Sequence, residues 1–218
     1  MRARKEAPGP RTPPPRSPAP TPLPPVLGRD FYERDVTEVA RDLLGCYLVT
    51  GSGRALTGGR IVETEAYGGP GDPGSHADRA PSGRARIMFG PAGIAYVYFT
   101  YGVHFCINAV TGPEGVGSAV LLRALEPMWG VRRMREAGAP ASLQDAKLAS
   151  GPGRLCRALG VGRDDNGADL TTGRIRILSR DGAPPETIAG IRVGLTLDDR
   201  RPWRFWTPSP AVSRGPVR

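Results

Sequence analysis

Two short runs of strand-forming residues, separated by a Tyr-Gly pair, constrain the fold of this chain most strongly. Ala95–Thr100 and His104–Val110 are rich in β-branched and aromatic residues, and Tyr101 and Gly102 lie between them. Such runs on either side of a glycine turn predict two antiparallel strands joined by a tight connection. A hairpin of this kind needs further strands to complete a stable sheet. We expect the ring of Tyr101 to be exposed at its tip.

The other periodic segments are short and lack the regular helix–strand alternation of a βαβ protein. Asp35 and Glu38 resemble a capping box at the start of one helix, and Pro152 and Gly160 mark the start and end of another. The pattern predicts a single α+β domain with a largely antiparallel, curved β-sheet core and surrounding short helices. Strands are expected at Cys46–Thr50, Arg60–Tyr67, Ser118–Ala124, Arg174–Leu178 and Ile191–Thr196, helices at Asp35–Leu44, Met128–Ala137 and Ser150–Gly160, and a long polar loop at Pro70–Arg86.

The first 25 residues differ in composition from the rest of the chain. They contain ten prolines, five basic residues and one acid. Burial of so little apolar surface cannot offset the conformational entropy that the segment would lose on ordering. We therefore expect a disordered tail at 1–25, a folded domain at 26–213 and a disordered end at 214–218. A mitochondrial targeting segment is one alternative, although the prolines oppose the amphipathic helix that it requires. A translation start further downstream is another.

Positive charge is carried almost entirely by arginine. The formal net charge is +9, and Lys5 and Lys147 are the only lysines. An arginine excess suits phosphate recognition, because the planar guanidinium can bind two phosphate oxygens at once. A genomic base composition that enriches Arg, Ala, Gly and Pro together explains the same excess equally well. Charge alone therefore does not identify the partner.

The three cysteines, Cys46, Cys106 and Cys156, are far apart and form no C-x-x-C pair. Their spacing matches no structural zinc motif and gives no disulfide framework, and their apolar neighbours favour buried free thiols. The chain has neither a run of 18 apolar residues nor a visible signal peptide. These features predict a cytoplasmic protein without a membrane partner.

Two carboxylates fall on one predicted strand. Ile61, Glu63, Glu65 and Tyr67 are expected to share a face, because strand side chains alternate. A carboxylate placed there can act as a general base that activates water. Glycosidases with two catalytic carboxylates hold them roughly 5–9 Å apart on either side of the scissile bond, so a single base fits this arrangement better. Ion pairs with the many arginines are the alternative, and on this pattern alone the commoner one.

Several other residues stand out from their surroundings. His76 lies in a loop of small and polar residues, where an ordinary surface histidine is the commoner interpretation. Tyr101 is either an exposed wedge or a hydrophobic cap on the sheet. Asn108 and Arg123 interrupt apolar runs, and buried polar groups need partners. Together with the carboxylates and the strand tyrosines, these residues indicate chemistry on a nucleobase held outside its helix.

Seven features occur in a fixed order between Tyr32 and Ser213: ARDLLG, GRIVETEAY, His76, MFGPAG, YVYFTYGVHFCIN, LLRALEP and SGPGRLCRAL. They closely resemble the alkyladenine DNA glycosylase family, also called 3-methyladenine DNA glycosylases of the mammalian type. The resemblance implies a monofunctional enzyme of base-excision repair, which flips an alkylated purine out of duplex DNA and hydrolyses its N-glycosidic bond. It implies a monomer without metal or organic cofactor, whose partner is double-stranded DNA with damaged bases, nucleoid-associated if prokaryotic.

The resemblance also implies roles for matching positions. Glu65, rather than Glu63, corresponds to the base that activates water, and Arg123 to the residue that helps to hold this water and the adjacent phosphate. The residues expected to line the base pocket are Tyr67, His76, Tyr98 and Asn108. Those expected to contact the DNA duplex are the wedge Tyr101 and Met88, Arg84, Ser150 and Arg154. A non-catalytic lesion-binding protein and a general nucleic-acid-binding module are the alternatives, which the embedded Glu65 and Arg123 oppose.

Two departures from the family pattern are expected to bear on substrate range. The family usually has Thr-x-Arg-Asn before Met-Phe, whereas this chain has Ser-Gly-Arg-Ala at Ser82–Ala85. Gly74, two positions before His76, is smaller than the residue in the mammalian relatives. We expect Gly74 to leave room above the base and Ala85 to remove a polar contact, so that the pocket walls are looser.

Overall fold

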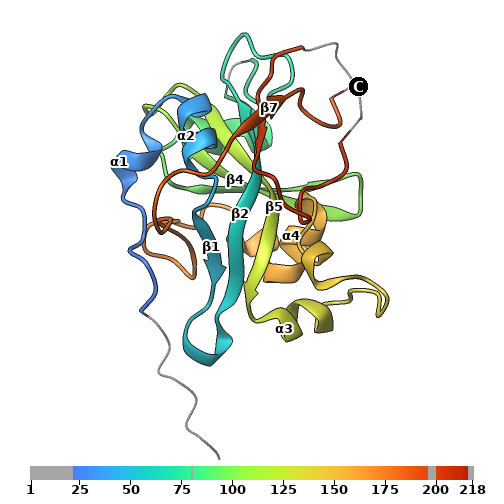
Figure 1. The fold of residues 1–218 in the computed structure, drawn as a ribbon. Helices are drawn as coiled ribbons and strands as arrows, with labels where there is room; N and C mark the ends of the chain where they lie inside the picture. Colours follow the sequence, from blue (N-terminus) through green and yellow to red (C-terminus); the bar gives the residue numbers. More distant parts are fainter. Residues whose placement is uncertain (1–21, 80, 196–199, 216–218) are drawn as a thin grey trace, which may run out of the picture.

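The long strand β2, Thr57–Tyr67, forms the centre of the sheet in the computed structural model, which describes residues 22–79, 81–195 and 200–215 (Figure 1). One edge of β2 pairs with β5, Ser118–Trp129. Along the other edge, its first half pairs with β1 (Tyr47–Thr50) and its second half with β8 (Arg204–Trp206). The backbone around both glutamates of β2 is therefore fixed from both sides.

The described residues form an eight-stranded antiparallel sheet in the order β3-β4-β5-β2-β1-β6, with β8 beside β2 and β7 beside β8. The other strands are β3 (Ala95–Thr100), β4 (His104–Thr111), β6 (Ile175–Leu178) and β7 (Ile188–Gly190). Short helices surround the sheet (Figure 1): α1 (Arg29–Tyr32), α2 (Val36–Asp42), α3 (Val131–Glu136) and α4 (Pro152–Leu159). Single 3-10 segments lie at Gly53–Ala55, Gly83–Phe89, Asp145–Lys147 and Arg163–Asp165. The architecture confirms the predicted α+β domain.

Local sequence signals set several of these boundaries. The Asp35 carboxylate caps α2 by accepting hydrogen bonds from the backbone N–H groups of Thr37 (2.8 Å) and Glu38 (3.3 Å). Caps of this kind contribute about 1 kcal/mol to stability. Helix α4 begins at Pro152 and ends where Gly160 adopts the left-handed conformation, with φ of 61°. Both helices were predicted from these residues.

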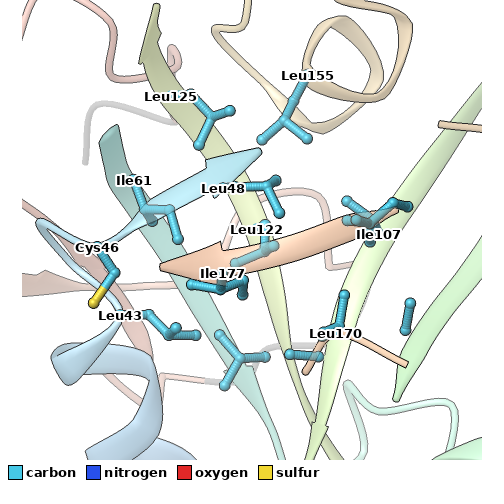
Figure 2. Close-up of a cluster of buried hydrophobic side chains, with 14 of the residues drawn as sticks. Leu43, Cys46, Leu48, Ile61, Ile107, Leu122, Leu125, Leu155, Leu170 and Ile177 are labelled. Carbon is cyan, nitrogen blue, oxygen red and sulfur yellow. The ribbon is translucent and has the colours of Figure 1, made fainter. Parts of the chain in front are cut away.

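The main hydrophobic core lies where α2 and α4 pack against strand residues of the sheet. Figure 2 shows Leu43 beside α2 and Leu155 on α4 converging with strand residues on one cluster. The strand residues in this view include Leu48 of β1, Ile61 of β2 and Leu122 of β5. All five side chains have no solvent exposure. Burial of a leucine or isoleucine side chain contributes about 1.5–3 kcal/mol to the stability of the fold, so this cluster holds the helices against the sheet.

Two predicted elements differ in the structure. The predicted helix at Met128–Ala137 begins only at Val131, because β5 continues to Trp129 and Gly130 then turns the chain with φ of 67°. The predicted strand at Ile191–Thr196 is wrong for residues 191–195, which form an irregular segment after β7, while Thr196 lies outside the described residues. Apolar alternation did not distinguish this segment from a strand.

The predicted common face of Ile61, Glu63, Glu65 and Tyr67 is wrong for one member. The register of β2 against β5 shifts on both sides of Glu63, which marks a bulge. Ile61 therefore points into the main core, whereas Glu63, Glu65 and Tyr67 share the opposite face. A bulge adds one residue to a strand and inverts the alternation beyond it. The bulge places both carboxylates on the side away from the core.

The three cysteines are buried and unpaired, as predicted. The expected disordered segments fall largely outside the described residues, which exclude 1–21 and 216–218. Within the described part of the chain, no helix combines the length and the apolar character needed to cross a membrane.

Candidate active site

A cavity of about 590 Å³ lies where the ends of β2, β3 and β4 meet the start of α4. This volume is in the range typical of small-molecule pockets. Most residues predicted to act in the site border the cavity: Tyr67, His76, Met88, Tyr98, Tyr101, Asn108, Arg123, Ser150 and Arg154. Glu65 and Arg84 do not border it, but each is bonded to residues that do. The structure therefore brings the whole predicted set together.

Glu65 is fully buried directly behind the cavity wall. One of its carboxylate oxygens, Oε1, accepts a hydrogen bond from the backbone N–H of Val193 at 2.6 Å. The other, Oε2, accepts from the Tyr67 hydroxyl at 2.8 Å and from the Arg123 guanidinium at 3.1 Å. All three donor residues line the cavity. A carboxylate offers about four acceptor positions, so these donors orient Glu65 and leave room for one more ligand.

Glu63 is also fully buried, but its surroundings are different. Its Oε1 accepts from Arg123 Nε, Arg204 Nε and Ser213 Oγ, each at 2.8 Å, and its Oε2 accepts from the Ser213 backbone N–H at 2.7 Å. Two guanidinium groups and a serine therefore saturate this carboxylate. Glu63 does not border the cavity.

The pKa values of the two carboxyls shift in opposite directions. Burial raises the pKa of Glu65 above its usual value of 4.5, even though Arg123 and the Val193 N–H counteract the shift. Burial also acts to raise the pKa of Glu63, but the positive charges of Arg123 and Arg204 together outweigh it and lower the pKa. The difference arises because Glu63 faces two cations and Glu65 shares one of them.

Three aromatic rings stand together on one side of the cavity. The rings of His76 and Tyr98 are 4.7 Å apart between centroids and nearly perpendicular, and Tyr96 lies 5.1 Å from Tyr98. The Arg84 guanidinium lies over the Tyr98 ring at 5.3 Å. Tyr67 borders the cavity from β2. Aromatic faces in a partly dry pocket are suited to stacking a planar base.

The bonding of His76 fixes its protonation state. Burial and the nearby Arg84 charge lower its pKa from 6.5 to about 4, so the ring is neutral at pH 7. Arg84 lies 3.2 Å from Nε2, and because a guanidinium only donates, Nε2 must be the unprotonated nitrogen. The proton then lies on Nδ1, which donates to the Tyr96 hydroxyl at 2.8 Å. Arg84, which was predicted to contact the DNA duplex, therefore also orients the His76 ring at the cavity.

Asn108 is buried on β4, and its amide donates to the Tyr96 carbonyl of the neighbouring strand at 2.9 Å. This bond satisfies the polar group that interrupts an apolar run and holds the amide at the cavity border. Asn108 therefore lines the cavity, and its expected role as the pocket floor stays a prediction.

Tyr101 projects from the tip of the β3–β4 hairpin. Its side chain is 79% exposed, and its φ of 50° is positive, which no other non-glycine residue shares in the described part of the chain. A bulky residue in this conformation is strained, and strain of this kind concentrates at functional sites. This exposure favours the wedge over the alternative that Tyr101 caps the sheet.

The start of α4 forms the opposite rim of the cavity. Ser150 is buried and its hydroxyl donates to the Val212 carbonyl at 3.4 Å, whereas Arg154 is exposed. Gly153 allows close packing, because a Cβ there would lie 2.7 Å from the His104 ring. The half-buried N-terminal turn of α4 and the exposed Arg154 together present positive charge beside the cavity.

The structure places Gly74 and Ala85, the two departures expected to loosen the pocket, in close-packed surroundings. A Cβ on Gly74 would lie 2.7 Å from the Arg192 guanidinium, so the space beside this glycine is already filled. Ala85 is buried in an apolar cluster with Met88 and Tyr96, where an asparagine amide would lack water. Both small residues are accommodated by close packing.

Sequence reasoning missed four contributors to the site: Asp72, Arg192, Val193 and Arg204. Arg192 and Asp72 form a buried ion pair, with two guanidinium–carboxylate hydrogen bonds of 2.7 Å. Val193 acts through its backbone, which no side-chain pattern reveals. The only signal was an arginine set in apolar surroundings, the signal that did mark Arg123. Within the described residues, no group of three or more His, Cys, Asp or Glu side chains is placed to hold a metal ion.

Comparison with known proteins agrees with this arrangement. Residues 30–211 match the family model of methylpurine-DNA glycosylase (MPG). The chain belongs to the methylpurine-DNA glycosylase family. A protein of Burkholderia lata, named "Putative 3-methyladenine DNA glycosylase", is 45% identical over 195 residues, which cover 88% of this chain and 92% of that protein. One of the same name from Methanoculleus marisnigri is 50% identical over 186 residues, 83% and 94% of the two chains. Family membership makes this chain a DNA N-glycosylase, an enzyme whose substrate is DNA.

Proposed function

We propose that this DNA N-glycosylase is monofunctional and removes alkylated purines from duplex DNA. The damaged nucleotide is flipped into the cavity, and its N-glycosidic bond is hydrolysed there. The observation that carries the proposal is Glu65, a buried carboxylate held by three cavity-lining donors. The roles that follow for the site residues are part of the same proposal.

Hydrolysis requires a base, a positioned water and an aromatic pocket for the leaving group. The water oxygen forms a bond to the anomeric carbon while Glu65 accepts its proton. The C–N bond breaks, and its electron pair leaves with the purine. An N-alkylated purine is already cationic and leaves as a neutral molecule, so no acid is needed for this substrate class. Carboxylate charge also stabilises the positive sugar ring of the transition state.

Arg123 links the two carboxylates and stays charged between them. It binds Glu63 through Nε and Glu65 through a terminal nitrogen, and it borders the cavity. This geometry supports a role in orienting Glu65 and in binding the phosphate beside the flipped nucleotide. The rings of Tyr67, His76 and Tyr98 are then the walls that hold the base, and Asn108 the floor.

The exposed residues around the cavity support a duplex substrate. Tyr101 at the hairpin tip is placed to fill the gap left by the flipped nucleotide, as apolar wedges do in other DNA-deforming proteins. Arg154 and the first turn of α4 supply positive charge on the opposite rim. No lysine borders the cavity in the described residues, and the ammonium of Lys147 is bonded to the Val212 carbonyl at 3.1 Å. This arrangement favours water over an amine as the nucleophile.

Purified protein should be tested on duplex oligonucleotides that each carry one lesion. The set consists of 3-methyladenine, 7-methylguanine, hypoxanthine and ethenoadenine, with undamaged duplex as the control. We expect abasic sites at one or more alkylated purines, strand cleavage only after alkali, and no trapping by borohydride. Failure to release any alkylated purine contradicts the proposed substrate class. Strand cleavage without alkali contradicts the monofunctional mechanism.

A further inference from the structure

We propose that Arg192, in its ion pair with Asp72, is a positioning residue for Glu65. It holds the Val193 N–H and the Tyr67 ring in the places from which they bind the carboxylate. The inference rests on the proposed function in that it takes Glu65 to be the general base. The pair lies on segments that carry no regular secondary structure, so side-chain bonds contribute to fixing their positions beside the few backbone bonds of the turn at Asp72.

Arg192 is bound on several sides at once. Its two terminal nitrogens donate to the two carboxylate oxygens of Asp72, each at 2.7 Å, and one of them also donates to the Ala66 carbonyl at 3.0 Å. Its guanidinium lies over the Tyr67 ring at 4.7 Å from the centroid. The Arg192 side chain has no solvent exposure and that of Asp72 only 2%, so this is a fully desolvated clamp.

Arg192 reaches Glu65 by two routes: through the residues that follow Glu65 on β2, and through Val193, its own neighbour in the sequence. Ala66 and Tyr67 directly follow Glu65 on β2, and Val193 directly follows Arg192. The Val193 N–H donates to Glu65 at 2.6 Å, and the Tyr67 hydroxyl at 2.8 Å. Two of the three donors to the base are therefore held by one guanidinium. Buried bidentate arginine bonds are well suited to this task, because the planar group fixes direction as well as distance.

Neighbouring residues are shaped around the clamp. The Asp72 carboxylate also accepts from the backbone N–H groups of Gly68 (2.7 Å) and Gly74 (3.1 Å). A Cβ on Gly74 would lie 2.7 Å from the Arg192 guanidinium. The glycine therefore allows the loop before His76 to close on Arg192. The loop that carries a base-pocket wall and the segment that carries Val193 are joined through this pair.

The predicted consequence is a shift of the acid limb, the low-pH side of the profile of excision rate against pH. The Val193 N–H bond lowers the pKa of Glu65, so its loss should raise that pKa further. The other titratable or charged groups that act on Glu65 are Arg123 of β5, Glu63 and Tyr67 of β2, and Cys106 of β4. Arg192→Met also removes a positive charge from beside the Tyr67 ring, so the variant whose shift reports the clamp geometry is Arg192→Lys, which keeps the charge.

Three variants test the inference by kinetics. Arg192→Met fills the space without the charge, Asp72→Asn keeps the shape of its partner, and Arg192→Lys keeps the charge without the paired geometry. We expect single-turnover excision to fall by up to about 100-fold in Arg192→Met, with less change in lesion-DNA affinity, because displacement of a catalytic group affects mainly the chemical step. The acid limb should shift to higher pH in all three variants, least in Arg192→Lys, more in Asp72→Asn and most in Arg192→Met. Arg192→Lys is the variant of choice if Arg192→Met does not fold.

The ion pair of Arg174 with Asp165 provides a control. Arg174 donates two hydrogen bonds to Asp165, of 2.7 and 2.9 Å, and neither residue contacts Glu65 in the bonds described above. Arg174→Met should lower Tm without moving the acid limb. An unshifted acid limb in both Arg192 variants, with a fall in Tm like that of Arg174→Met, would show that the clamp is only structural.

An activity-free measurement separates this inference from the proposed function. In labelled protein, the Val193 amide ¹⁵N–¹H signal should titrate together with the Glu65 carboxyl carbon. In Arg192→Lys the Glu65 midpoint should rise and the amide response should weaken. If the Val193 amide and the Glu65 carboxyl still titrate together, with an unchanged midpoint, in Arg192→Lys, the clamp is overturned even if lesions are excised. Loss of coupling supports it even if the lesion assay fails.

Discussion

Glu63 and Glu65 lie two residues apart on the same strand and the same face, yet their surroundings assign them different tasks. Glu63 accepts four hydrogen bonds in the described structure, three of them to one oxygen, from Arg123, Arg204 and Ser213. Glu65 accepts three, and every one comes from a residue that borders the cavity. One carboxylate is saturated and closed off, and the other is oriented and within reach of the cavity.

The hydrogen-bond and charge partners, rather than the residue type, decide which of the two acids is suited to catalysis. Two guanidinium groups lower the pKa of Glu63 in spite of its burial, so its charge is compensated. Burial raises the pKa of Glu65, because it shares one guanidinium with its neighbour. A buried base with incomplete charge compensation is reactive toward a proton, whereas a compensated one is part of the frame.

The largest expected effect is that of Glu65→Gln. We expect single-turnover excision to fall by about 10²–10⁴-fold, because an amide cannot accept the water proton. A raised folded-state pKa means that ionised Glu65 does not stabilise the fold above that pKa, so Tm at pH 7 should not fall. Lesion-DNA binding, measured by fluorescence anisotropy, should persist. Retention of excision would exclude Glu65 as the general base.

Glu63→Gln should give the opposite pattern. Removal of one partner from a buried ion-pair network costs about 3–5 kcal/mol, and here Arg204 loses its carboxylate while Arg123 keeps only its bond to Glu65. For a domain of this size we expect Tm to fall by roughly 10 °C or more. Well below the new Tm, excision should stay within about tenfold of the wild type, because Glu65 keeps its own donors. Thermal unfolding and single-turnover assays on the same samples check both parts.

Much of the sheet could be predicted because its strands carry local signals. The β3–β4 hairpin was found from its glycine turn, and α4 from Pro152 and Gly160. The predicted strand at Ile191–Thr196 has strand-like composition, but its described residues 191–195 pair with no strand of the described sheet. Pairing over long sequence distances depends on tertiary packing, which a local pattern does not contain.

Selection between the two glutamates could not be made from residue patterns alone, and the resemblance to a family supplied it. The bulge at Glu63 is invisible in the sequence, and it changes which residues share a face. The Arg192–Asp72 pair joins positions 120 residues apart, and the Val193 contribution is purely backbone. Polar residues in apolar runs, such as Asn108 and Arg123, were the signals that did indicate the site.

A pH titration should separate activity from stability. If Glu65 is the proposed general base, excision should be lost as the pH falls through a midpoint above 4.5. Glu63 has a lowered folded-state pKa, so its contribution to stability is present above its unfolded value and is lost only as the pH falls through the lower folded value. We therefore expect an interval of pH in which the protein is folded, inactive and fully recoverable. Excision assays and circular dichroism across the same buffers test this. Simultaneous loss of both signals would mean that the two carboxyls titrate as one unit.

The smallest expected effect on the fold is that of Tyr101→Ala, which sharpens the division between residues that act and residues that hold. Tyr101 is 79% exposed and strained, so its removal should change the free energy of unfolding by no more than about 0.5 kcal/mol. Lesion binding should weaken and excision slow, because flipping costs a few kcal/mol that an inserted ring offsets. Phe99→Ala is the matched control, since Phe99 lies on the same hairpin but packs on Phe105 at 5.0 Å. Phe99→Ala should lower Tm more and excision less. If the two variants instead rank the other way, Tyr101 belongs with Glu63 among the residues that hold the fold.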